Sequence, residues 1–307
     1  MEQTTVEESQ RWFVAHGWHF DNNKDFVDKD GKFFDYPTQG QHYEYLQEQI
    51  RDLVFKEMET NFDLEQHQIP KAKGQKPPVD EEEKKEFDVY CPTIFTSKDA
   101  TFKPNLLVIV QGLGMVPPGQ WARKLFTNGL KDQYKLATQM PYIEKAQKHE
   151  DWGLVLCDPN HASPEPKTED TRAHHVLRVW QDVVAPSKAK NIMYIGFSAG
   201  TVAVLDLYDT LSVRPEFVKR VKAIALLDGE SGASRQAQGQ DGKWLQDHSR
   251  AYCQKGMSGF LGPNSETVNT HDHDSVPGLA VDSVFEFLDE MLQIFGEDVI
   301  ADKEKSQ

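Results

Sequence analysis

Residues 191–211 combine three patterns that restrict the fold more than any other stretch of the chain. Residues 191–195 form a strand-length apolar run, Gly196-Phe197-Ser198-Ala199-Gly200 follows directly, and residues 200–211 have helical periodicity. In a Gly-x-Ser-x-Gly turn the glycines permit a sharp strand-to-helix bend, so the serine hydroxyl projects from the edge of the sheet. The sequence therefore predicts a nucleophile elbow at Ser198.

Strand-length apolar runs alternate with helical segments over most of the chain after Phe87. Short runs rich in Val, Ile and Leu are typical of strands that are covered on both faces. They lie at residues 105–110, 153–157, 191–195 and 221–227. Helical periodicity occupies residues 119–130, 138–148, 172–184, 200–211 and 281–295. This alternation predicts an α/β fold with right-handed crossovers, a mostly parallel central sheet and helices on both faces.

The amino-terminal part, residues 1–69, is predicted to add a hairpin and a helix packed on that core. Residues 11–20 are aromatic and rich in strand formers, Asp28-Lys29-Asp30-Gly31 has turn composition, and residues 42–62 place apolar side chains at helical spacing. Residues 70–86 combine Pro, Gly and dense charge, which predicts a flexible loop. The main domain is then expected at 87–300, with a tail at 301–307.

Ligands of parallel sheets bind outside the carboxyl ends of the strands, so the polar residues that follow each strand are the candidates for chemistry. These residues are Gln111-Gly112-Leu113-Gly114, Asp158-Pro159-Asn160-His161, Ser198 and Asp228-Gly229-Glu230. A serine nucleophile needs a general base and an acid that orients it, in the chain order Ser, acid, His for this kind of fold. Asp228 is the candidate acid, with Glu230 as its substitute. His271 and His273 are the candidate bases, because they lie in the last polar loop before the final helix.

Two backbone amides are expected to stabilise an oxyanion beside Ser198. The amide after the nucleophile belongs to Ala199, and the glycine-rich loop at Gly112, Leu113 and Gly114 is placed to supply the second. A dinucleotide-binding Gly-x-Gly-x-x-Gly pattern is excluded here, because Pro117 occupies the position of the third glycine.

The composition disfavours several other classes of function. The 34 Lys and Arg against 49 Asp and Glu give a net charge of −15, which disfavours direct nucleic-acid binding. No apolar run is long enough for a membrane helix and no signal-peptide pattern begins the chain, so we expect an intracellular protein without membrane contact. The three widely spaced cysteines are typical of reduced thiols. No metal-ligand spacing is evident, and neither a metal nor another cofactor is expected.

The residues also resemble a known family, the Argonaute-binding-protein-two domain family, and most closely its animal members, the cotranscriptional regulators. The resemblance spans roughly residues 10–295, and the segment Gly119-Gln120-Trp121-Ala122-Arg123 is its most specific part. It is also carried by Leu107 to Gly112, Asp158-Pro159-Asn160, His175 to Trp180, Ala225 to Asp228, and His273 ahead of the final helix. Two features depart from the pattern: Gln111 replaces a histidine of the relatives, and the basic insertion and basic tail of the animal proteins are absent.

The resemblance implies an α/β-hydrolase-like fold, a nucleophile at Ser198, and His273 rather than His271 as its base. It also implies relatives that act with Argonaute complexes, in small-RNA silencing, heterochromatin or splicing. Two functions therefore stay open at this stage. One is a serine hydrolase that acts on an ester, thioester or amide of a small molecule or a modified protein. The other is a catalytically silent adaptor that binds Argonaute, chromatin or RNA-regulatory proteins in the cytoplasm or nucleus.

Overall fold

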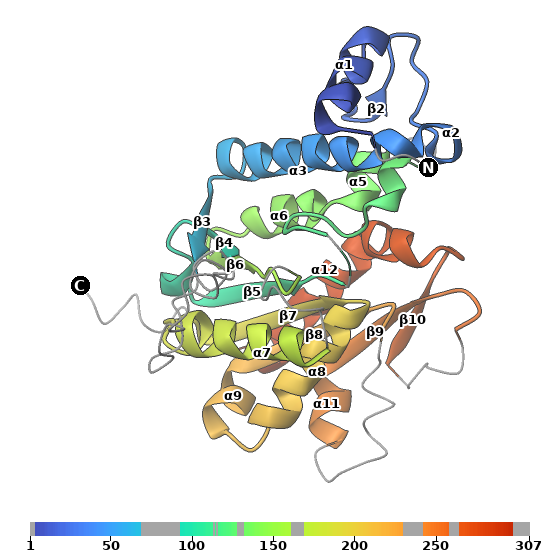
Figure 1. Ribbon diagram of the computed structural model, residues 1–307. Coiled ribbons are helices and arrows are strands. Elements are labelled where there is room, and N and C mark those ends of the chain that lie inside the picture. The colour runs from blue at the N-terminus through green and yellow to red at the C-terminus, as the bar shows by residue number, and fades with distance from the viewer. Residues whose placement is uncertain are drawn as a thin grey trace.

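The central element of the computed structural model is an eight-stranded mixed sheet (Figure 1). The structure describes residues 4–68, 93–112, 114, 116–127, 132–160, 169–229, 242–257 and 264–296. The strand order is β3-β4-β6-β5-β7-β8-β9-β10, and β4 alone in this sheet, as far as it is described, runs against both of its neighbours. The bounds are β3 Leu64–Gln68, β4 Thr93–Ser97, β5 Asn105–Val110, β6 Trp152–Leu156, β7 Asn191–Phe197, β8 Val221–Leu227, β9 Ser249–Gln254 and β10 Ser265–Val268.

Helices cover both faces of this sheet, and alternating side chains of each central strand enter two separate cores. In β5, Leu107 and Ile109 point into one core, whereas Leu106, Val108 and Val110 point into the other. The first core is covered by α3 (Tyr43–Thr60), α5 (Gln133–Ala137), α6 (Met140–Gln147) and α12 (Val276–Phe295). The second is covered by α7 (Glu169–Val179), α8 (Ala199–Leu211), α9 (Pro215–Arg220) and α11 (Gly242–His248) (Figure 1). The predicted α/β class with a mostly parallel sheet is confirmed.

Two predicted elements are wrong. Residues 119–130 contain no α-helix among those described, but only the short 3₁₀ helix η3 (Lys124–Thr127), because the Trp121 side chain enters the core and the Trp121 backbone N–H donates to the Ala137 carbonyl. Residues 11–20 are mostly helical rather than extended. They belong to α1 (Val6–His16), which begins at a capping box of Thr5 and Glu8 that satisfies the free N–H groups of the first turn.

The amino-terminal residues share the first core with the sheet. After α1, the short strands β1 (His19–Phe20) and β2 (Phe26–Val27) form a hairpin, and α2 (Tyr36–Gln39) leads into α3. The predicted turn at Asp28 to Gly31 is present, since the Asp28 N–H donates to the Lys32 carbonyl and Val27 bridges Phe33. Domain boundaries at 69/70, 86/87 and 300/301 stay predictions; residues 70–86 and 301–307 lie outside the described residues.

Helix α8 approaches the sheet so closely at its first turn that only glycine fits there. A Cβ atom on Gly200 would lie 2.7 Å from the carbonyl oxygen of Gln111 and closer still to that of Val110. A Cβ on Gly196 would lie 2.8 Å from the Gly200 carbonyl oxygen. Since these obstacles are backbone atoms of α8 and of the end of β5, they cannot turn aside, and the two glycines of the elbow allow α8 to start directly above β5 and β7.

We expect Gly200→Ala to destabilise the protein, because the added methyl group overpacks backbone against backbone. A loss of about 1–3 kcal/mol in the free energy of unfolding is typical of overpacked cores. Gly40→Ala is the matched control: its Cβ would lie no closer than 3.6 Å to the Tyr36 ring, in helical backbone. Chemical denaturation measures both. Equal stability of the two variants would contradict the close approach of α8 to the sheet.

Candidate active site

Ser198 lies at the turn between β7 and α8, as the elbow pattern predicts. Its backbone has φ 52° and ψ −122°, a combination that residues other than glycine rarely adopt. Hydrogen bonds hold the turn: the Ser198 N–H donates to the Leu227 carbonyl, and the N–H and hydroxyl of Thr201 both donate to the Ser198 carbonyl. The Ser198 side chain is only partly buried, so the strained turn presents the hydroxyl to incoming molecules.

Asp228 follows β8 directly and gathers donors from two other elements. Its carboxylate accepts the N–H of Gln254 at 2.9 Å, the side-chain amide of Gln254 at 3.0 Å and Nδ1 of His273 at 2.6 Å. The side chain is 1% exposed. A buried carboxylate with this number of donors is held in one orientation, and it fixes the imidazole that it contacts.

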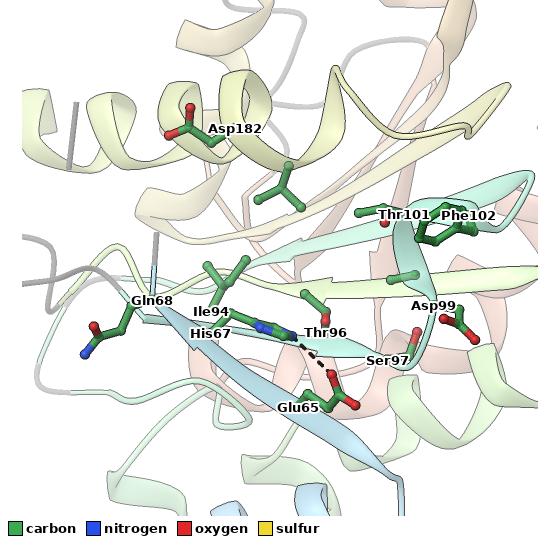
Figure 2. A pocket seen from close by; sticks show the side chains of 12 residues that line it. Glu65, His67, Gln68, Ile94, Thr96, Ser97, Asp99, Thr101, Phe102 and Asp182 are labelled. Atoms are coloured by element: carbon green, nitrogen blue, oxygen red, sulfur yellow. Dashed lines mark ion pairs between the residues drawn. The ribbon is translucent and has the colours of Figure 1, made fainter. Parts of the chain in front are cut away.

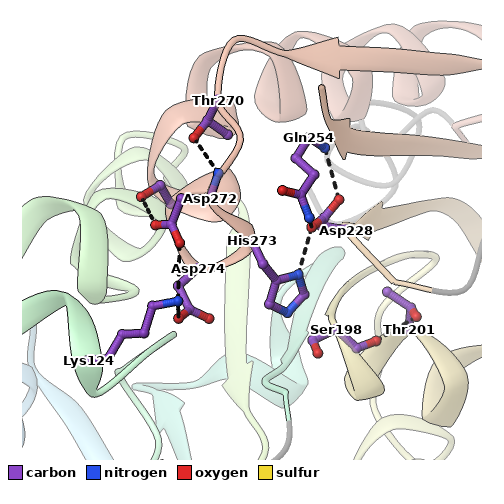
Figure 3. A network of polar contacts seen from close by, with 10 residues as sticks. Lys124, Ser198, Thr201, Asp228, Gln254, Thr270, Asp272, His273 and Asp274 are labelled. Carbon is purple, nitrogen blue, oxygen red and sulfur yellow. Dashed lines mark hydrogen bonds and ion pairs between the residues drawn. The ribbon is translucent and has the colours of Figure 1, made fainter. Parts of the chain in front are cut away.

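His273 begins the 3₁₀ turn η6 (His273–Ser275), and its ring lies between Asp228 and Ser198 (Figure 3). One ring nitrogen contacts Asp228, and the other is turned towards Ser198. The ring also stacks on Phe197, with centroids 4.9 Å apart. The hydrogen bond to Asp228 raises the pKa of His273, with help from the charges of Asp228 and Asp274, while burial and Lys124 oppose the rise.

Asp228 and His273 form a hydrogen-bonded pair, and the ring of this pair is turned towards the serine of the elbow. The Asp228 carboxylate accepts a proton-bearing Nδ1, which leaves the lone pair of Nε2 free to take the Ser198 proton. The order Ser198, Asp228, His273 along the chain is the one that this kind of fold requires. The structure therefore brings together all three residues proposed from the sequence.

The loop proposed for the oxyanion passes directly against Ser198. A Cβ on Gly112 would lie 3.0 Å from the Cβ of Ser198. The side-chain amide of Asn160 donates to the carbonyls of Gly112 and Val116 at 2.8 and 3.1 Å, and the amide of Gln111 also donates to Val116 at 3.1 Å. The side-chain amides of Gln111 and Asn160 thus hold this loop together.

The donor roles of this loop stay predictions. Leu113 lies outside the described residues, while Gly114 is exposed on the loop and Ala199 begins α8 directly after the nucleophile. Glu230, the substitute acid, also lies outside the described residues. His271 is exposed.

Other titratable residues near the sheet have structural roles. Nε2 of His175 accepts the N–H of Asp158, and complete burial lowers the pKa of His175 to about 3, so its ring stays neutral. His248 stacks between Trp244 and Phe295. Burial raises the pKa of the Cys157 thiol, which keeps it protonated. Among the described residues, no group of three or more His, Cys, Asp or Glu side chains is arranged to hold a metal ion.

A cavity of about 350 Å³ lies elsewhere, between η4 (Trp180–Val184) and the β3–β4 edge of the sheet (Figure 2). Its lining includes His67, Thr96, Phe102 and Asp182, and it shares no residue with the Ser198 site. No described helix has the length and apolar character needed to cross a membrane.

Comparisons with known proteins agree with this architecture. The Arb2 domain profile matches residues 162–256. A FAM172 family protein homolog of Caenorhabditis elegans is 35% identical over 209 residues, which make up 66% of this chain and 59% of that protein. The cotranscriptional regulator ARB2A homolog of Gallus gallus is 26% identical over 258 residues, 65% of this chain and 57% of that protein. The chain thus spans less than two thirds of the length of these two relatives.

A solved structure shows the same fold. The histone deacetylase Clr3 superposes with a TM-score of 0.51 and 19% identity, over 93% of this chain and 43% of that one. The sheet order and the serine elbow define a chain of the α/β-hydrolase class. Within that class, the chain is similar to the Arb2 domain over residues 162–256 and to proteins named as FAM172 and ARB2A homologs.

The sequence did not reveal two residues that complete the site. Gln254 supplies two of the three donors to Asp228, but it ends β9, a strand that was not predicted because its run Ser249–Gln254 is short and mixed in polarity. Phe197 supports the His273 ring from the variable second position of the elbow. No sequence signal marks either role, since each depends on contacts between distant strands.

We expect Ser198→Gly to be more stable than Ser198→Ala, because glycine adopts φ 52° without the steric strain that any Cβ creates there. Strain of this kind costs about 1–3 kcal/mol, and the greater freedom of glycine in the unfolded chain offsets part of the gain. Thermal and urea denaturation of the two variants give the difference. A Ser198→Gly protein clearly less stable than Ser198→Ala would mean that the elbow is not strained.

The pKa of His273 should fall in Asp228→Asn, because the hydrogen bond to a charged carboxylate is the main cause of its rise. The ring of the variant therefore loses its proton at a lower pH. In the wild type, the raised pKa of His273 stabilises the fold at acidic pH, and this stabilisation is lost as the pH rises through the folded pKa. The variant lacks most of this stabilisation. NMR titration of the imidazole measures both pKa values, with Asp282→Asn, an exposed partner of Lys145, as the control. A pKa unchanged by Asp228→Asn would contradict the observed pairing.

Proposed function

We propose that the chain is a serine hydrolase that acts on an ester, thioester or amide carbonyl. The observation that carries this proposal is the position of His273, whose ring contacts the buried Asp228 carboxylate on one side and is turned towards Ser198 on the other. The three residues come from separate strand ends and a distant loop. The substrate is expected to be an acyl-type small molecule or an acylated protein.

The residues support a two-step acyl transfer. Ser198 Oγ forms a bond to the carbonyl carbon while its proton moves to Nε2 of His273, and the developing imidazolium is stabilised by Asp228. His273 then gives this proton to the leaving alcohol, thiol or amine as its bond to the carbonyl carbon breaks. A water molecule, deprotonated by the same nitrogen, attacks the acyl-serine, and the proton returns to Ser198 as the acid is released.

The negative charge of the intermediate has a suitable place at the start of α8. The helix begins directly after Ser198, so its first free N–H groups and its dipole favour an oxyanion there. The Ala199 amide is the first proposed donor. The second is proposed to come from the loop at Gly112, Leu113 and Gly114, whose first residue packs against Ser198.

A second candidate function is regulation through protein partners, and the names of the relatives favour it. Several similar proteins are named cotranscriptional regulators, and a fold can retain an enzyme-like site while it serves as a binding module. In this proposal the chain binds Argonaute, chromatin or RNA-regulatory proteins in the nucleus or cytoplasm. The net charge of −15 favours protein partners over direct contact with nucleic acid.

A fluorophosphonate probe tests the hydrolase directly, because it reacts only with an activated serine. We expect one label per chain at Ser198, none in Ser198→Ala, and labelling of His273→Ala slower by about 10²–10⁴-fold through loss of the general base. Ser212→Ala, at the far end of α8, serves as the control. Folded wild-type protein that takes up no label at neutral pH would overturn the hydrolase proposal.

The regulatory proposal has its own test. Affinity purification of wild type and Ser198→Ala should recover the same Argonaute or chromatin proteins if binding is independent of the site. Recovery of none of them would count against the proposal, whatever the probe shows.

A further inference from the structure

The loop that carries His273 is anchored on the side opposite Asp228 by Lys124. The Lys124 ammonium contacts Asp272 at 3.2 Å and Asp274 at 2.7 Å, the two residues that flank His273 in the chain (Figure 3). With both carboxylates turned to Lys124, the imidazole between them lies on the side of Asp228 and Ser198.

Short-range hydrogen bonds make this loop a compact unit. The Asp272 carboxylate accepts the Ser275 hydroxyl at 2.5 Å, and the Asp272 N–H donates to the Thr270 hydroxyl at 3.0 Å. The loop is thus internally braced, and two ionic contacts join it to η3. Movement of η3 would therefore move the whole turn, His273 included.

Trp121, three residues before Lys124, also supports the His273 imidazole through the ring of Phe197. Trp121 is fully buried and meets Phe197 edge to face, with centroids 5.8 Å apart, and Phe197 in turn stacks on His273 at 4.9 Å. The Trp121 ring meets the Tyr142 ring edge to face, with centroids 5.3 Å apart, and the Trp121 backbone N–H donates to the Ala137 carbonyl. Residues 121–124 thus support His273 in two ways. Lys124 forms ion pairs with the residues on either side of His273, and Trp121 packs against Phe197, which stacks on the His273 ring.

We propose that Trp121 and Lys124 are positioning residues that hold His273 in line with Ser198, a role that rests on the proposed hydrolase function. Neither residue is placed to touch a substrate in this scheme. Their effect comes through the placement of the base, where an error of about 1 Å costs on the order of 10²-fold in rate. Lys124 is the better residue to test, because its side chain is 61% exposed and its replacement leaves no cavity in the core, whereas Trp121 is fully buried.

The charges around His273 give this role a signature that a purely structural residue lacks. The charged groups that face the ring and its loop are Asp228, Asp272, Asp274 and Lys124. Lys124 lowers the pKa of His273, and Asp274 raises it. Removal of Lys124 should therefore move the rise of activity with pH to higher pH, whereas removal of the Asp274 charge should move it to lower pH.

The experiment measures the rate of Ser198 labelling by a fluorophosphonate across pH in the full chain. We expect Lys124→Met to slow labelling by about 10-fold or more and to raise the pH midpoint. Asp274→Asn should also slow labelling but lower the midpoint. Lys124→Arg, which can contact both carboxylates, should recover most of the rate. The control is Lys148→Met, which removes a similarly exposed lysine that pairs with Glu144.

The outcomes separate this proposal from the one it rests on. Wild-type labelling at Ser198 together with an unchanged rate and midpoint in Lys124→Met would overturn the positioning role and leave the hydrolase intact. The same holds if Lys124→Met and Lys148→Met slow labelling equally. If the wild-type protein takes up no label, the hydrolase proposal is overturned, and the positioning role of Lys124, which rests on it, is overturned as well. Melting temperatures of Lys124→Met and wild type should agree within about 2 °C, the scale of a weak surface ion pair.

Discussion

A single buried carboxylate joins the parts of the chain that make up the site. Asp228 ends β8, accepts two donors from Gln254 at the end of β9, and accepts His273 from the turn before α12. Its side chain thus connects the end of β9 and the turn before α12 to the strand end beside the serine elbow. The elbow depends on a second constraint, the glycine contacts that bring α8 against β5. Together they place a strained serine opposite an oriented imidazole.

Much of the fold and of the catalytic set could be predicted because both depend on local patterns. The apolar runs gave β5, β6, β7 and β8 nearly to the residue, and the elbow required Ser198 at a strand end. The order of residues along the chain pointed to Asp228, with Glu230 as its substitute, and to His271 or His273, and the family resemblance selected His273. Residues 119–130 failed as a helix because Trp121, a residue that fits helical periodicity, is used to fill the core beneath Phe197 instead. The strands β9 and β10 are too short and polar for periodicity to reveal.

The contacts that orient Asp228, the oxyanion loop and the His273 turn could not be predicted, because they join residues that lie far apart in the sequence. Gln254, Asn160 and Lys124 act across sequence distances of 26, 48 and about 150 residues, and no spacing rule connects them to their partners. Gln111, which departs from the family pattern, has a structural role that its sequence context does not reveal: its side-chain amide donates to the Val116 carbonyl. Similarity to the Arb2 domain and to proteins named cotranscriptional regulators agrees with the fold, and the proposed activity of Ser198 follows from its own surroundings.

The proposed hydrolase requires Ser198 to form a covalent acyl intermediate that His273 helps to make and to hydrolyse. Rapid mixing of the protein with an activated ester, followed by intact-mass analysis, tests this step most directly. We expect a burst of released alcohol close to one per chain and a matching acyl mass on Ser198 that decays on standing. Steady release without a burst, at equal rates in wild type and Ser198→Ala, would contradict it.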